Sequence, residues 1–288
     1  MGLISKTKRY LKGISLKKEA IDNPVLYGSL LEGRTALVTG GTSGIGLSIA
    51  EAYARNGAAV VITGRKRERV DTAVEAIHQK VGDIRLGGIV LDNSSADEAT
   101  FAHALDKAES LLGKPIGILV NNAGIIAGKA MPNTHEDEFD ITVNTNLRGA
   151  FFLSQAFAKR LISNGSPGNI LNVCSSSSLR PAISPYTISK WGLRSMTLGF
   201  AKALIPHDIV VNGIAPGPTA TPMLVGDDDG NLVNEVVPAG RYATSDEIAN
   251  MAVVLASDLS RMVVGDIIYM TGGCGNLTFD DMSYALKI

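Results

Sequence analysis

The sequence predicts an α/β fold in which one doubly wound, seven-stranded parallel sheet carries helices on both faces. Short β-branched runs alternate along the chain with longer amphipathic stretches, which is the pattern of strand–helix–strand units. The runs are too apolar to have one solvated face, as is typical of parallel strands that are covered on both sides. A glycine-rich turn, residues 39–46, joins the first run to the first amphipathic stretch.

Each element follows from these patterns in chain order. The β-branched runs predict strands over residues 34–39, 58–63, 85–91, 116–121, 169–175, 209–214 and 266–270. The amphipathic stretches predict helices over residues 44–56, 66–80, 96–112, 136–163, 184–204 and 244–257. Such a sheet binds its ligands beyond the carboxyl ends of its strands. We therefore expect the functional residues in the loops at that edge.

Composition excludes several classes of protein. The 288 residues are 45% hydrophobic, which suffices for a folded core, and 27 Lys and Arg balance 28 Asp and Glu. A net charge of -1 argues against nucleic-acid binding. Cys174 and Cys274 are too few for a disulfide framework, and the four histidines lack zinc spacing, so we expect no metal. Because we find neither a membrane-spanning run nor a secretory signal, we expect a cytoplasmic protein.

A basic arm precedes the first predicted strand. Residues 1–18 hold six Lys and Arg and no acid, and on a helix the apolar side chains of this segment share one face. One interpretation is an amphipathic helix on an anionic membrane surface, which would make the protein membrane-peripheral. The other is a solvated tail, or a helix packed on the protein itself. Residues 19–33 are expected to be a linker, so the arm and linker together span residues 1–33.

The glycine-rich turn has the composition of a phosphate-binding loop. Glycines let such a turn tighten and let its backbone approach a pyrophosphate, which then lies at the helix N-terminus. The spacing here is Gly-x3-Gly-x-Gly, and a turn that serves only packing is the alternative. We expect cofactor contacts from Gly40, Thr42, Ser43, Gly44, Ile45 and Gly46.

With three further motifs, this turn makes the chain resemble the short-chain dehydrogenase/reductase family. The motifs are Asn121-Asn122-Ala123-Gly124, Tyr186-Thr187-Ile188-Ser189-Lys190 and Pro216-Gly217-Pro218-Thr219-Ala220-Thr221. The resemblance implies a single Rossmann-type dinucleotide-binding catalytic domain over residues 34–288, a nicotinamide cofactor and a homo-oligomer, either a tetramer or a dimer. It also implies cofactor contacts from Asp92, Asn93, Asn122, Ala123, Gly124, Tyr186, Lys190, Pro216, Gly217, Thr219 and Thr221.

The chemistry of hydride transfer gives roles to four residues. The carbonyl oxygen must gain or lose a proton, and a tyrosine can transfer it where a cation favours the phenolate. Tyr186 and Lys190 lie four apart on one face of a predicted helix, so we expect Tyr186 to be the general acid/base and Lys190 its cationic partner, which also holds the ribose. Ser175, rather than the serines that follow it, is expected to donate to the substrate oxygen. The resemblance assigns Asn146 to a water that links Lys190 to solvent, with Asn144 as the alternative.

The end of the second predicted strand bears on cofactor choice. NAD-dependent members of this fold place an acid there, which binds the adenine ribose hydroxyls. Gly64 occupies that position here, and Arg65 follows it. A guanidinium suits a 2′-phosphate, and a missing carboxylate no longer repels it. We therefore expect NADP(H) to be preferred, with Arg65 on the phosphate. NAD(H) is the alternative, because Ser43 stands where some NADP-using relatives carry a basic residue.

The substrate is expected to be a small molecule with a carbonyl or secondary alcohol group. The residues expected at the pocket are mostly apolar, which favours a steroid-like or lipid-like compound: Ile125, Ile126, Met131, Leu179, Ile183, Met223, Leu224 and Val225. A 3-oxoacyl thioester and a sugar or polyol are alternatives. Residues 227–229, three aspartates, are expected at the tip of a lid. A rival of another class is a catalytically silent nucleotide-binding sensor.

Overall fold

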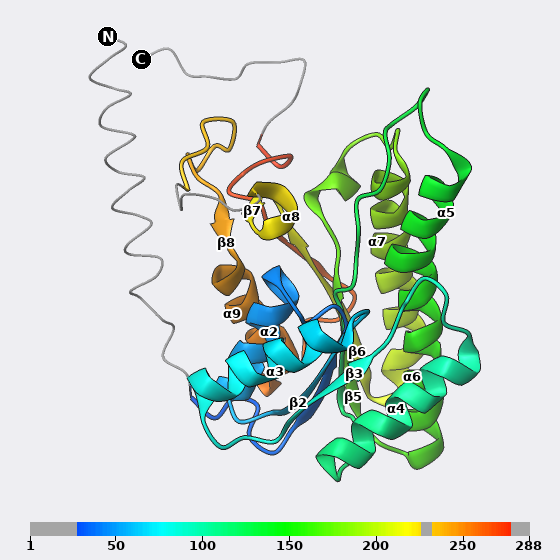
Figure 1. The fold of residues 1–288 in the computed structure, drawn as a ribbon, viewed down its shortest axis with the longest axis vertical. Coiled ribbons are helices and arrows are strands. Elements are labelled where there is room, and N and C mark those ends of the chain that lie inside the picture. Colours follow the sequence, from blue (N-terminus) through cyan, green and yellow to red (C-terminus); the bar gives the residue numbers. More distant parts are fainter. Residues whose placement is uncertain (1–27, 226–231, 278–288) are drawn as a thin grey trace.

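One seven-stranded parallel sheet forms the centre of the molecule, as the sequence predicts (Figure 1). The computed structural model describes residues 28–225, with the side chains of 224 and 225 excepted, and residues 232–277. The strand order is β3-β2-β1-β4-β5-β6-β9, and every neighbouring pair is parallel. The strands are β1 (Thr35–Val38), β2 (Ala59–Gly64), β3 (Leu86–Val90), β4 (Ile118–Asn121), β5 (Gly168–Val173), β6 (Ile209–Pro216) and β9 (Ile267–Met270).

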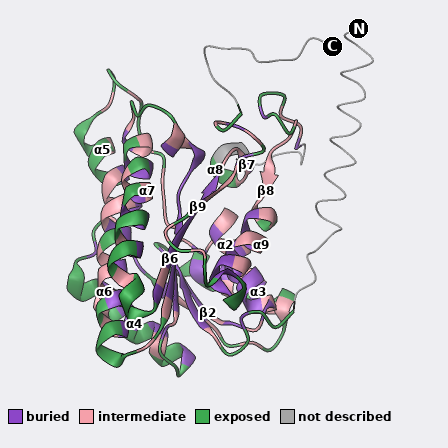
Figure 2. Cartoon of the chain, turned by 180° about the vertical axis from the view of Figure 1, so that it is seen from behind, coloured by how far each residue is buried: buried purple, intermediate pink, exposed green. Residues whose placement is uncertain are grey.

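Helices cover both faces of this sheet, and two large apolar cores result (Figure 1). One core joins the sheet to α2 (Gly44–Arg55), α3 (Arg67–Val81) and α9 (Ser245–Ala256). The other joins it to α4 (Glu98–Leu112), α6 (Gly149–Asn164) and α7 (Pro185–Leu204). Along β1, Ala36 and Val38 belong to the first core and Leu37 to the second. Figure 2 shows the burial concentrated in the sheet and on the helix faces turned toward it.

The strand order creates a crevice at the carboxyl edge of the sheet. The chain leaves β1 toward β2 and β3, and then returns to place β4 on the other side of β1. The loops after β1 and β4 therefore diverge from adjacent strands, which is where ligands of doubly wound sheets bind. Both loops carry predicted cofactor residues.

The helix predicted over residues 136–163 is present, but it is not α-helical throughout. It consists of α5 (Glu136–Val143), a π-helical segment over Asn144–Arg148, and α6. A π-turn adds one residue to the helical path, and the apolar periodicity on either side gives no sign of it. Asn146 lies inside the π-helical segment, so the interruption falls at a predicted site residue.

Other boundaries also differ from the predicted ones. The fifth strand ends at Val173, so Ser175 lies beyond it. The sequence did not predict α8 (Pro222–Val225) or the small parallel sheet formed by β7 (Thr219–Ala220) and β8 (Ala243–Thr244). The end of the expected linker packs on the domain, because Leu31 is fully buried and its N–H donates to the carbonyl of Asn56. The predicted arm over residues 1–18, the lid tip at 227–229 and the tail beyond 277 lie outside the described residues.

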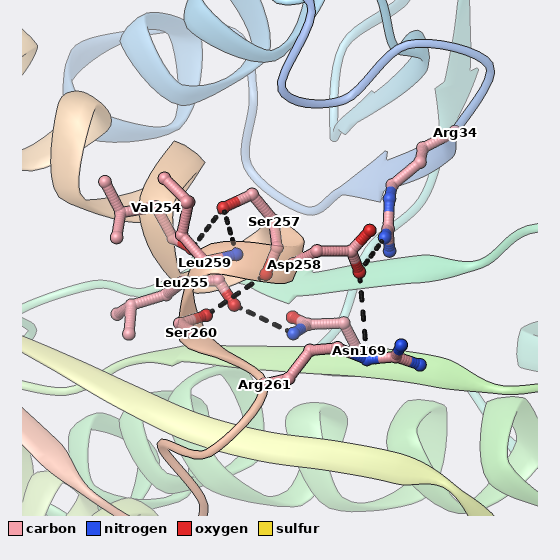
Figure 3. Close-up of polar contacts among 9 residues, drawn as sticks. All are labelled: Arg34, Asn169, Val254, Leu255, Ser257, Asp258, Leu259, Ser260 and Arg261. Carbon is pink, nitrogen blue, oxygen red and sulfur yellow. Dashed lines mark hydrogen bonds and ion pairs between the residues drawn. The ribbon is translucent and has the colours of Figure 1, made fainter.

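Polar contacts fix the end of α9 at the amino edge of the sheet (Figure 3). The Asn169 side chain in β5 donates from Nδ2 to the carbonyl of Leu255, at 2.9 Å. Ser257 accepts the N–H of Leu259 on its hydroxyl and so caps the turn that follows. Arg34, just before β1, pairs with Asp258 at 2.6 Å. This edge is structural and faces away from the crevice.

No helix among the described residues is long and apolar enough to cross a membrane.

An ion pair at the start of α9 makes stability depend on pH. Arg241 binds Glu247 through two hydrogen bonds of 2.6 and 2.8 Å, and Glu247 also accepts the N–H of Thr244, which caps the helix. The hydrogen bond from Arg241 lowers the pKa of Glu247, with help from Thr244 and against partial burial. A carboxylate whose pKa is lowered by folding stabilises the protein above its unfolded pKa. That stabilisation is lost as the pH falls through the folded pKa.

We therefore expect Glu247→Gln to lower the free energy of unfolding at pH 7 by about 0.5–1 kcal/mol, a modest value because both side chains are partly exposed and screened. The difference from wild type should shrink below about pH 4, where glutamates protonate in the unfolded chain. Chemical denaturation between pH 3 and 7 measures it. Glu98→Gln is the control, because Glu98 is 63% exposed and lies 3.8 Å from Lys159. An equal effect of both substitutions, or a difference independent of pH, would contradict the assignment.

Candidate active site

The glycine turn after β1 and the loop after β4 form one bonded unit. The Thr39 hydroxyl accepts the N–H groups of Asn122 and Ala123, both at 3.0 Å. The Asn122 side chain donates in return to the carbonyls of Thr39 and Gly40, at 2.9 and 3.1 Å. Asn122 thus holds the shape of the turn with its side chain. The sequence predicts that Asn122, Ala123 and Gly124 border the cofactor, and the structure places Asn122 and Ala123 beside the glycine turn, with Gly124 next in the chain.

The turn fits a phosphate-bearing ligand. A Cβ at Gly40 would lie 2.9 Å from the Cα of Ala123, so only glycine allows this approach. Helix α2 begins at Gly44, its N-cap Ser43 makes no side-chain capping bond, and its first turn holds no acid. The N–H groups of that first turn are therefore available to an anion. Ile45 and Gly46 continue this turn.

The loop after β6 lies beside the glycine turn. A Cβ at Gly44 would be 3.5 Å from the side chain of Thr221. Gly217 donates its N–H to the carbonyl of Met270, and Thr219 is buried and donates to the carbonyl of Gly217. Pro216 ends β6. The predicted cofactor residues of β1, β4 and β6 thus come together at one edge of the sheet.

Two further predicted cofactor residues follow β3. Asp92 is half-buried, and one oxygen of its carboxylate accepts both the N–H and the hydroxyl of Ser94, at 2.9 and 2.7 Å. Asn93 is 5% exposed. A Cβ at Gly149 would lie 2.6 Å from the Asn93 carbonyl oxygen, so Asn93 packs directly on the start of α6.

Lys190 is a buried cation beside Tyr186. Its side chain is 5% exposed, and its Nζ donates to the carbonyl of Val173 at the end of β5, at 2.8 Å. The same Nζ lies 5.7 Å from the centroid of the Tyr186 ring. In the described part of the chain no carboxylate pairs with Lys190. Because lysine is rarely buried without a counter-charge, this placement points to a functional role.

Ser175 lies two residues beyond β5, at the start of a short 3-10 helix over Ser176–Leu179. Its Oγ accepts the N–H of Ser177 at 3.1 Å, so its own hydroxyl proton is left to donate. Ser178 is fully buried and donates to the Ser175 carbonyl at 2.7 Å. The hydroxyl of Ser178 is therefore already committed, whereas that of Ser175 is not.

Asn146 connects three parts of the site. Its Oδ1 accepts the N–H of Ile125 at 2.8 Å, and its Nδ2 donates to the Ile125 carbonyl at 2.9 Å and to the Ser189 hydroxyl at 3.1 Å. Ser189 in turn donates to the carbonyl of Tyr186, at 2.7 Å. The alternative, Asn144, takes no part in this network. The sequence motifs do not single out Ser189, because its bond to Asn146 joins residues 43 positions apart in the chain.

The end of β2 presents the residues expected to choose the cofactor. Gly64 is the last residue of the strand and is buried, while Arg65 is exposed. Among the described residues, none forms an ion pair with Arg65. Arg67, by contrast, reaches Asp71 at 3.4 Å. The Arg65 guanidinium is thus exposed and unpaired in the part of the chain that the structure describes.

The expected pocket residues that the structure describes are largely apolar and exposed. Met131 is 74% exposed, Ile183 60%, Met223 58% and Ile126 55%. The N–H of Met131 donates to the carbonyl of Ile183 at 3.0 Å, which joins the loop after β4 to the segment that leads into Tyr186. Ile125 and Leu179 are half-buried, and the side chains of Leu224 and Val225 lie outside the described residues.

Cys174 lies between this site and the core. It is 3% exposed, and burial raises the pKa of its thiol to about 11, although the positive charge of Lys190 acts in the opposite direction. Such a thiol stays protonated at neutral pH and is not a nucleophile. Among the described residues, no three His, Cys, Asp or Glu side chains are grouped as metal ligands.

Comparison with known proteins agrees with this arrangement. A family model described as enoyl-(acyl carrier protein) reductase matches residues 40–275. A gluconate 5-dehydrogenase of Gluconobacter oxydans is 36% identical over 84% of this chain and 95% of its own length. A 3alpha-hydroxysteroid dehydrogenase of Mediterraneibacter gnavus is 34% identical over 84% of this chain and 97% of its own length.

Solved structures with related sequences also superimpose on this chain. A short-chain type dehydrogenase/reductase from Mycobacterium marinum superimposes with a TM-score of 0.77 at 31% identity, over 84% of this chain and 96% of that one. A gluconate 5-dehydrogenase from Burkholderia cenocepacia, in complex with NADP and tartrate, superimposes with a TM-score of 0.75 at 33% identity, over 85% and 96% of the two chains. This chain therefore belongs to the short-chain dehydrogenase/reductase family of oxidoreductases.

Proposed function

We propose that this protein interconverts a ketone and a secondary alcohol by hydride transfer, with Tyr186 as the general acid/base. The observation that carries the proposal is the buried ammonium of Lys190, 5.7 Å from the centroid of the Tyr186 ring and without a carboxylate partner among the described residues. A cation held in this way favours the phenolate. A catalytically silent nucleotide sensor would have no need of this placement.

Each residue then has one task. Tyr186 donates its proton to the carbonyl oxygen during reduction and takes it back during oxidation. The Ser175 hydroxyl donates a hydrogen bond to the same oxygen, where negative charge develops. Lys190 keeps positive charge beside the phenol, and Asn146 holds the loop after β4 against α7. A nicotinamide dinucleotide, when bound, supplies or accepts the hydride.

The first test is Tyr186→Phe, which keeps the ring and removes the transferable proton. We expect kcat to fall by about 10²–10⁴-fold, while the Kd for NADPH changes little. Stopped-flow kinetics and fluorescence titration measure the two quantities. Tyr269→Phe is the matched control, because the Tyr269 hydroxyl has no hydrogen-bond partner among the described residues. Near-normal kcat in Tyr186→Phe would show that another group transfers the proton.

We propose NADP(H) as the preferred cofactor. Three features support it: Gly64 provides no carboxylate at the end of β2, Arg65 is exposed there without an ion-pair partner in the described part of the chain, and similar solved structures contain NADP. A 2′-phosphate at this corner would accept charge-assisted hydrogen bonds from the guanidinium.

Arg65→Ala should therefore reduce kcat/KM with NADPH by about tenfold to a hundredfold, since a hydrogen bond to a charged group contributes roughly 1.5–3 kcal/mol. The value with NADH should stay within about threefold, because NADH has no 2′-phosphate for Arg65 to contact. Arg69→Ala is the control, because Arg69 is an exposed arginine in α3, four residues further along the chain. Equal losses with both cofactors would mean that Arg65 acts on a part that NADPH and NADH share.

For the substrate we propose an apolar ketone or alcohol of the steroid-like or lipid-like class. The exposed side chains of Ile126, Met131, Ile183 and Met223 support it, because they present apolar surface on the loops next to the site. A polyol acid is the second candidate, since relatives named gluconate 5-dehydrogenase are similar over most of the chain. A 3-oxoacyl thioester is the third, and the family model named for acyl carrier protein chemistry keeps it open.

A substrate panel separates these classes. NADPH oxidation is followed with a steroid ketone, a 5-keto sugar acid and a 3-oxoacyl thioester at matched concentrations. We expect the apolar ketone to have the highest kcat/KM. Met131→Gln should then lower that value at least about tenfold, since a polar amide would disrupt the apolar surface without adding charge, and leave the value for the anionic 5-keto sugar acid unaffected. If the 5-keto sugar acid had the highest kcat/KM, the substrate would be a polyol acid and not an apolar ketone.

We also propose that the protein is a homo-oligomer that associates through the outer faces of α6 and α7. Ile188, Trp191 and Leu198 are 39–49% exposed, and their spacing places them on one face of α7. On α6, the exposed ring of Phe151 lies 5.1 Å from that of Phe200 on α7. Contiguous apolar surface of this kind favours a partner, and a second copy presents the same surface.

Leu198→Lys should therefore shift the protein toward monomer, because a lysine ammonium is costly to bury in an apolar contact. Light scattering coupled to size exclusion, at several protein concentrations, measures the mass. Leu111→Lys changes an equally exposed leucine on α4 and should leave the mass unchanged. A wild type that is monomeric at all concentrations, or the same shift in both variants, would rule out this surface.

A further inference from the structure

The end of β2 is covered by the glycine turn itself. A Cβ built on Gly64 would lie 2.5 Å from the methyl carbon of Thr42 and 3.5 Å from the Thr42 hydroxyl oxygen. Thr42 is half-buried and β-branched, so its side chain has few rotamers. The packing of Thr42 on Gly64 therefore leaves no room for any side chain at position 64, a carboxylate included.

The opposite side of Gly64 is closed as well. The same Cβ would lie 3.1 Å from a methyl carbon of Val70, which is fully buried in α3. Val70 has little room to withdraw, since it packs directly on Gly88 in β3, where a Cβ would also collide with it. Two side chains, those of Thr42 and Val70, thus contact this Cβ position. Of the two, only Thr42 belongs to a turn at the carboxyl edge of the sheet, where ligands bind.

We propose that Thr42 is a specificity-determining residue for the dinucleotide. Its side chain occupies the space that the Cβ of an acidic residue at the end of β2 would need. A carboxylate at position 64, as in NAD-type sites, is then incompatible with the present turn unless Thr42 becomes smaller. This proposal rests on the proposed NADP(H) preference and adds a second residue to Arg65, which acts by attraction where Thr42 acts by exclusion.

The packing half of the proposal is tested without any cofactor. Gly64→Ala should lower the melting temperature of the ligand-free, full-length protein by about 3 °C or more, because it overfills a packed site. In a Thr42→Ala background, Gly64→Ala should lower the melting temperature by less than half as much. The effects of the two substitutions are then not additive. Gly199→Ala in α7, with nothing within 4 Å of the added Cβ, controls for the loss of a glycine. Equal losses in both backgrounds, or none in either, would overturn the contact.

The specificity half is tested with NAD⁺ and NADP⁺ by titration calorimetry. Gly64→Asp alone should not tighten NAD⁺ binding, because Thr42 blocks the new side chain. Thr42→Ala with Gly64→Asp should tighten it by about tenfold or more, the effect of a charged hydrogen bond to the ribose. Equal NAD⁺ affinities of the single and double variants would overturn the role of Thr42. A wild type that prefers NAD⁺ would refute both the proposed cofactor and the specificity role, while the unfolding cycle would still decide whether Thr42 packs on Gly64.

Discussion

The hydrogen bonds of one buried amide, that of Asn146, hold the site together. The side chain is 1% exposed, so each of its polar atoms must find a partner inside the protein. Two bonds to the backbone of Ile125 fix the loop after β4, and one to Ser189 fixes the first turn of α7. A single side chain thus joins the loop after β4 to the helix that carries Tyr186.

The burial of Lys190 depends on this arrangement. An ammonium in the interior is costly unless its donors are satisfied, and here the carbonyl of Val173 satisfies one of them. A chain of hydrogen bonds between buried polar side chains also connects β4, through β5, to α7. Asn121 donates to Asn172, which donates to Thr197 in α7, at 2.8 and 2.9 Å. These bonds fix α7 against β5, so Lys190 is held beside Tyr186 and against the carbonyl of Val173, two residues before Ser175 along the chain.

Most of the fold could be predicted from the sequence because it follows from local patterns. Runs such as Ala59–Gly64 are continuous apolar segments only because both faces of the sheet are covered. The glycines at 40 and 46 and the pair Tyr186 and Lys190 were also visible as spacings. The π-helical segment was not, because one inserted residue leaves the apolar periodicity on either side intact. Ser189 and the contact between Thr42 and Gly64 depend on tertiary approach, which no spacing in the sequence reveals.

We propose that the Asn146 network positions Tyr186 for proton transfer. The most direct test is Ser189→Ala, which removes the acceptor for Asn146 and the donor to the Tyr186 carbonyl but leaves every group that would touch substrate. We expect single-turnover hydride transfer to slow by about tenfold, since the lost positioning raises the barrier by roughly 1.4 kcal/mol, while NADPH affinity stays within about threefold. Ser110→Ala, on the exposed side of α4, should change neither quantity. An unchanged transfer rate in Ser189→Ala, with the network broken, would contradict the claim.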